Sequence, residues 1–200
     1  KAAAHVNVHT SKVLVDGTTW VVQPGDIVYH AKHLTIDHFA VTHGNQHIII
    51  AGLATPNPKD SVVAELKNVD IGYILNLVNF HTVEFSGKAS GKAYIASAFN
   101  KPSASARLQI DDFRFEDGRM GTLYADSRWN EKEGQIDIDA IAKDTVFNRM
   151  GERYVPLETS IQGYVSPRKN NIELNIKANG TRIEFLKSFC GSFIDRVDAF

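Results

Sequence analysis

Eight histidine side chains are the first candidates for chemistry in this chain of 200 residues. Ligands that share a zinc ion lie about 2 Å from it and so must be close together. His5 and His9 flank Val6 and Val8, whose alternation indicates a strand. On a strand these two imidazoles would stand roughly 13–14 Å apart, too far to share one ion. Five more histidines fall in neighbouring predicted strands and a turn, namely His30, His33, His38, His43 and His47. We expect surface histidines on a polar sheet face, with a metal-dependent hydrolase as a weaker alternative.

Three aspartates, Asp37, Asp111 and Asp112, could act as catalytic carboxylates or as calcium ligands. Each lies where the alternation of apolar and polar residues slips by one position, between Leu34/Ile36 and Phe39/Val41 or between Leu108/Ile110 and Phe113/Phe115. A slip that returns the apolar side chains to the same face is typical of a β-bulge. The positions therefore favour a backbone role over catalysis.

Other patterns that would indicate an enzyme are absent from the sequence. It contains no Gly-x-Ser-x-Gly motif and no phosphate-binding glycine loop followed by Lys-Ser/Thr. Cys190 belongs to an apolar helical pattern and is expected to be buried. Trp20 and Trp129 could stack on sugars, but they alternate with polar residues as core side chains do. We expect no catalytic residue, no cofactor and no metal.

The segments that carry these residues are repeated. Residues 34–51 are echoed without a gap at residues 108–125, 74 positions later, and each copy includes a turn, His43-Gly44 or Asp117-Gly118. Six positions are identical: Leu34/Leu108, Ile36/Ile110, Asp37/Asp111, Phe39/Phe113, Gly44/Gly118 and Ala51/Ala125. Repeated units that cannot bury an apolar face alone usually stack into one continuous structure. The duplicated residues are therefore expected to be structural.

Alternation with a period of two residues runs through most of the chain and predicts about a dozen strands. Turns are predicted at 56–60 and 130–134, and Val62, Ala64 and Leu66 alternate as Ile172, Leu174 and Ile176 do. Ile71–Val78 has the spacing of an amphipathic helix, and a second short helix is predicted after a capping box at Thr181–Glu184. The predicted fold is all-β: an elongated antiparallel β-meander with one or two short amphipathic helices.

Composition sets the remaining limits. The 22 basic and 23 acidic residues nearly cancel, so nucleic acid is not an expected partner. One cysteine excludes an internal disulfide, and no apolar run reaches the ~18–20 residues that span a bilayer. We interpret residues 1–200 as a single β-rich segment of a larger repeat array, with units at roughly 12–80 and 81–200, excised from a longer protein.

The ordered set of motifs resembles the TamB family, the large AsmA-like subunit of the bacterial translocation and assembly module. The resemblance covers most of the chain and rests on motifs that are degenerate one by one but ordered together. They are Trp20-x-Val22-x-Pro24, Leu34-x-Ile-Asp-x-Phe-x-Val41, Asn45-Gln-His-Ile-Ile-Ile-Ala-Gly52, Leu66-Lys-Asn-Val-Asp-Ile-Gly-Tyr-Ile-Leu75, Phe85-Ser-Gly-Lys-Ala-Ser-Gly91, Pro102, Leu108-x-Ile-Asp-Asp-Phe-x-Phe115 and Gly121-x-Leu-x-Ala-x-Ser-x-Trp129.

This resemblance implies a non-enzymatic segment of a periplasmic protein whose full-length form is anchored in the inner membrane. It implies a sheet folded lengthwise into a taco-like trough with an apolar inside, which serves lipid transport and outer-membrane protein assembly. The implied partners are a phospholipid or other acyl-chain ligand and an outer-membrane barrel protein of the BamA/TamA type. The many histidines are not a feature that the resemblance explains.

The apolar residues of the alternating strands are the candidates for lining such a groove. They are Leu34, Ile36, Phe39, Val41, Leu66, Leu108, Ile110, Phe113, Phe115, Leu123, Trp129, Ile136, Ile138, Leu174 and Ile176. The alternative is a closed β-sandwich that binds carbohydrate or protein, with Trp20 or Trp129 as the sugar platform. The choice depends on whether the apolar face is open or covered by a second sheet.

Overall fold

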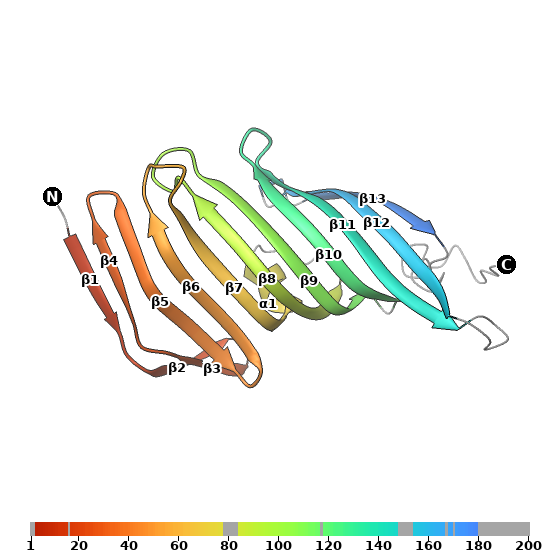
Figure 1. Ribbon diagram of the computed structural model, residues 1–200, viewed down its shortest axis with the longest axis horizontal. Coiled ribbons are helices and arrows are strands. Elements are labelled where there is room, and N and C mark those ends of the chain that lie inside the picture. The colour runs from red at the N-terminus through yellow and green to blue at the C-terminus, as the bar shows by residue number, and fades with distance from the viewer. Residues whose placement is uncertain are drawn as a thin grey trace.

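The described residues form one open antiparallel sheet of thirteen strands with one short helix, α1 (Figure 1). The computed structural model describes residues 3–179 except 16, 78–83, 117, 148–153, 167 and 170. The predicted all-β meander is confirmed. The alternative of a closed sandwich is wrong for the described residues, because the sheet neither closes on itself nor packs against a second sheet.

The strands follow one another across the sheet in nearly the order of the sequence, so the long axis of the molecule crosses them (Figure 1). Eleven strands form the path β1-β4-β5-β6-β7-β8-β9-β10-β11-β12-β13, and the β2–β3 hairpin joins through β3 to β5. Their bounds are β1 Ala3–Val8, β2 Ser11–Val15, β3 Thr18–Val22, β4 Gly25–His30, β5 His33–His43, β6 Gln46–Ala54, β7 Ser61–Asp70, β8 Phe85–Ala96, β9 Ser103–Phe115, β10 Gly118–Asn130, β11 Gln135–Phe147, β12 Tyr154–Ser166 and β13 Asn171–Asn179.

Bulges occur at both positions where the alternation slips. From Ile36 to Phe39, β5 advances by three residues while its partner β6 advances by two. The extra residue of β5 therefore lies at Asp37–His38. In β9 the extra residue lies at Asp111–Asp112, and Asp112 has a positive φ of 50°. Both predicted bulges are confirmed. The three aspartates therefore belong to bulges, which keep the apolar side chains before and after them on the same face.

Two further bulges were not predicted. One lies in β7 between Leu66 and Val69, where Asn68 has a φ of 53°. The other lies in β10 around Gly121, whose φ is 87° and whose Cβ, if present, would lie 2.2 Å from the carbonyl oxygen of Lys143. Only glycine fits that close approach between neighbouring backbones.

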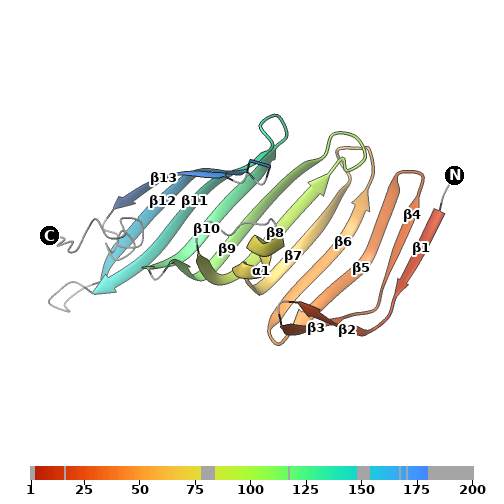
Figure 2. The same ribbon diagram turned by 180° about the vertical axis from the view of Figure 1, so that it is seen from behind.

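Helix α1 (Ile71–Leu77) begins directly after β7 and lies across the sheet in front of β7 and β8 (Figure 2). Ile71, Ile74 and Leu75 pack against the buried cluster of the sheet, which confirms the predicted amphipathic pattern up to Leu77. Val78, the second helix predicted after residue 180, and Cys190 lie outside the described residues.

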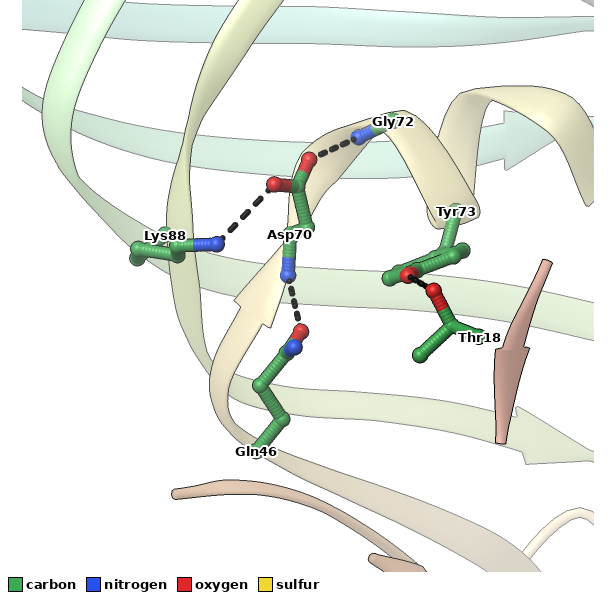
Figure 3. Close-up of polar contacts among 6 residues, drawn as sticks. All are labelled: Thr18, Gln46, Asp70, Gly72, Tyr73 and Lys88. Atoms are coloured by element: carbon green, nitrogen blue, oxygen red, sulfur yellow. Dashed lines mark hydrogen bonds and ion pairs between the residues drawn. The ribbon is translucent and has the colours of Figure 1, made fainter. Parts of the chain in front are cut away.

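Asp70 caps this helix and ties three strands together (Figure 3). Its Oδ1 accepts a hydrogen bond from the Gly72 backbone N–H at 3.0 Å, as an N-cap side chain does. Its Oδ2 pairs with Lys88 Nζ on β8 at 2.9 Å, and its own N–H donates to Gln46 Oε1 on β6 at 2.9 Å. The carboxylate therefore anchors the turn from strand to helix.

Replacing this carboxylate should weaken the helix more than removing its ion-pair partner. We expect Asp70→Ala to lower the free energy of unfolding by about 1–2 kcal/mol through the lost cap. Lys88→Ala should cost no more than about 1 kcal/mol, because the pair is nearly half exposed. Urea titration followed by circular dichroism measures both values. Equal losses in the two variants would show that capping is not the role of Asp70.

Candidate functional site

The register of the strands places the apolar side chains on one face of the sheet. Residues directly opposite each other on antiparallel strands point to the same face. One such row crosses nine strands without a charged residue: Val41, Ile48, Leu66, Gly91, Leu108, Ala125, Ala140, Ile161 and Ile176. We call the surface that contains this row the apolar face, and the opposite surface the polar face.

The polar face carries a corresponding row of charged and amide side chains. It runs across seven strands through Glu65, Lys92, Arg107, Asp126, Asp139, Gln162 and Asn175. Glu65 pairs with Lys92 at 3.2 Å, and Arg107 pairs with Asp126 at 2.8 Å. The two faces therefore differ sharply in chemistry over most of the sheet.

All fifteen residues predicted to line a groove lie on the apolar face, since each one belongs to the same side in the register. Four of them are buried: Ile110, Phe113, Phe115 and Leu123. The other eleven are partly exposed: Leu34, Ile36, Phe39, Val41, Leu66, Leu108, Trp129, Ile136, Ile138, Leu174 and Ile176. Further large apolar residues of this face were missing from the prediction although their alternation marks them, among them Ile27, Ile48, Ile50, Val62, Val69, Phe85, Ile95, Met120, Ile161 and Ile172.

Near β8, β9 and β10 the apolar face is filled by its own side chains. Phe85 packs against Phe113 and Phe115, with ring centroids 5.8 and 5.3 Å apart. A hollow in this region holds only about 10 Å³, close to the least space that one water needs. It is lined by Phe85, Phe113, Phe115, Met120, Ile161, Leu174 and Ile176.

Exposed apolar surface is found toward the N-terminal half of the sheet and at the outer ends of the strands. Val6 on β1 is 51% exposed and Ile95 on β8 is 49% exposed, and both lie on the apolar face. Ile27, Ile36 and Ile50 between them are partly exposed. A guest that contacts apolar side chains would find them here, not over the packed aromatic residues.

The β2–β3 hairpin and α1 contact each other on the apolar face. Trp20 on β3 is 4% exposed and meets the Tyr73 ring of α1 edge-on, with centroids 5.5 Å apart. The Tyr73 hydroxyl donates to Thr18 Oγ1 at 2.8 Å (Figure 3). Trp20 is thus a core residue, as expected, and is too buried to stack on a sugar. Trp129 is partly buried with Arg168 above its ring at 5.6 Å.

Most of the histidines in the strands lie on the polar face. His30 and His33 oppose each other there, and His5 Nε2 lies 3.2 Å from Asp26 Oδ1. The expectation is wrong for His43, which lies on the apolar face with its ring 5.8 Å from that of Trp20 and its Nδ1 bonded to the Thr19 carbonyl at 2.9 Å. Within the described part of the chain, no three His, Cys, Asp or Glu side chains gather in a way that could hold a metal.

Comparison with known proteins adds no identification: no family model, no curated protein and no solved structure matches this chain. The one helix that the structure describes is too short to cross a membrane. The candidate site is therefore described by its geometry alone: it is the apolar face of a single sheet layer.

The contact between Trp20 and α1 should hold the β2–β3 hairpin on the sheet. Trp20→Ala removes a buried side chain of a size that usually contributes about 3–5 kcal/mol. We expect β2, β3 and α1 to lose protection in amide hydrogen exchange, while β10 and β11 remain protected. Tyr73→Phe should have a smaller effect of about 0.5–1.5 kcal/mol, because it removes one hydrogen bond only. A uniform loss of protection across all strands would contradict this assignment.

Proposed function

We propose that this segment is non-enzymatic and that its apolar face carries the acyl chains of lipids. The observation that supports this most is that a continuous apolar face belongs to a single, open sheet layer. In ordinary globular proteins a second layer covers such a face. Here the described covering elements are the β2–β3 hairpin and the seven-residue helix α1, which leave Val6 and Ile95 about half exposed.

Acyl chains suit this surface for an energetic reason. Exposing one CH₂ group to water costs about 0.8 kcal/mol, so a lipid tail leaving a membrane needs an apolar surface along its whole path. Eleven strands spaced about 4.8 Å apart make a face of roughly 48 Å, about three times the ~15 Å depth of one leaflet's hydrocarbon layer. Smooth contact with aliphatic side chains holds a tail without fixing it at one position, which permits sliding.

The likeness to the TamB family supports the wider context of this proposal. The open antiparallel sheet, with one apolar and one polar face, supports this context, and the lengthwise fold into an apolar trough is part of the proposal. We accordingly propose a periplasmic location, an inner-membrane anchor outside this segment and an outer-membrane barrel partner. An apolar β-strand of an unfolded outer-membrane protein has the same need for cover as an acyl chain, so assembly of such proteins is part of the proposal.

Two neighbouring isoleucines of β6 provide a matched test. Ile50 lies on the apolar face and Ile49 on the polar face, and both are partly buried. Ile50→Asp places a charge in the proposed path, and a charge is costly against hydrocarbon. We expect it to reduce the lipid that co-purifies with the protein, measured by mass spectrometry of extracts, and the transfer of a fluorescent phospholipid between vesicles. Ile49→Asp should retain both.

The circular dichroism spectra of both variants report whether the sheet is intact. If folded wild-type protein neither carries nor transfers phospholipid, the proposed function is wrong. If the two aspartate variants lose lipid equally, the apolar face is not the path.

A further inference from the structure

A larger hollow lies on the polar face, across β8, β9, β10 and β11, which run side by side in the middle of Figure 1. This groove has a volume of about 970 Å³ and is open to solvent. It lies on the side of the sheet opposite the proposed lipid path, and the lipid proposal makes no use of it.

The groove has small residues on its floor and long side chains beside them. Ser90 and Ser105 are among the small polar-face residues that line it. Two tyrosines line it as well: Tyr94 on β8 is 40% exposed and Tyr124 on β10 is 45% exposed. Tyr94 opposes Ser105 and Tyr124 opposes Gln109, so the two tyrosines are two strands and four residues apart. That offset corresponds to roughly 17 Å between their backbones.

Charge in the groove is balanced and accessible. Three cationic side chains, Lys92, Arg107 and Arg128, face three carboxylates, Asp126, Asp137 and Asp139. Arg107 Nε donates to Asp126 Oδ1 at 2.8 Å between the two tyrosines, while the side chains remain 83% and 64% exposed. This hydrogen bond, and then the attraction of the carboxylate, raise the pKa of Arg107. A polyanion such as nucleic acid would require an excess of cations, which this lining lacks.

We propose that this groove binds a neutral oligosaccharide. A sugar ring has an apolar C–H face and a rim of hydroxyl groups. Exposed tyrosines offer an apolar ring face with a polar tip. The charged side chains form strong hydrogen bonds with sugar hydroxyls, because the cations donate to a hydroxyl oxygen and the carboxylates accept from a hydroxyl group. The distance between Tyr94 and Tyr124 exceeds the size of one sugar, so the geometry points to a chain of several units lying across the Arg107–Asp126 pair.

Calorimetric titration of the 200-residue protein with chitohexaose, cellohexaose and maltohexaose tests this proposal. We expect at least one of these neutral hexaoses to bind. Tyr94→Ala and Tyr124→Ala should each weaken that binding about three- to tenfold, the range expected for loss of one ring contact. Tyr94→Phe and Tyr124→Phe should retain most of the affinity, because the ring face remains.

Tyr164 provides the control. It lies on the polar face outside the groove, with its hydroxyl 3.1 Å from Glu173, so Tyr164→Ala should leave hexaose binding unchanged. Circular dichroism verifies folding, and the phenylalanine variants keep the test valid where an alanine variant unfolds. No binding of any hexaose at millimolar concentration overturns the proposal. So does stronger binding of an acidic hexamer of galacturonate, or equal losses in the Tyr94, Tyr124 and Tyr164 alanine variants. Because lipid transfer is measured separately, failure here leaves the function of the apolar face unaffected.

Discussion

The structure depends on keeping the two-residue period of side chains in phase across a very wide sheet. A slip of one residue in any strand would turn its apolar side chains to the polar face. The row from Val41 to Ile176 crosses nine strands without such an error. Bulges maintain this phase where a strand contains an extra residue, as at Asp37–His38 and Asp111–Asp112. These aspartates therefore contribute to the fold through the backbone, by keeping one face apolar.

A single open sheet buries less apolar area than the two packed layers of most β proteins. This single layer buries apolar area on one side, and the described part of the chain contains no second sheet that would complete a core. Side chains of the sheet itself bury part of the apolar area that a second layer would cover. The phenylalanines of β8 and β9 pack with Met120 and Ile161 into a nearly void-free cluster. The hairpin anchored by Trp20 and the helix capped by Asp70 cover another part. The apolar surface that remains is what makes an apolar guest physically reasonable.

The two faces offer different kinds of recognition. The apolar face provides extended, non-directional contact, whose strength grows with buried area and which therefore suits guests that slide. The polar groove provides directional hydrogen bonds and two exposed rings, which suit a ligand held in one register. Because the faces are separated by one layer of backbone, a substitution can alter one surface while its neighbour in sequence alters the other, as Ile49 and Ile50 illustrate.

Sequence alone predicted about a dozen strands, the alternation of side chains along them, two bulges and a helix beginning at Ile71, because these follow from local periodicity. It also identified fifteen residues that share the apolar face. Whether a second layer covers that face was decided only by tertiary structure, since alternation is identical in an open sheet and a sandwich. Tertiary structure also decided that Phe113 and Phe115 are packed away, that His43 turns toward Trp20, and that the larger hollow lies on the polar side. Those outcomes depend on contacts between distant strands and on sheet curvature, neither of which a local pattern encodes.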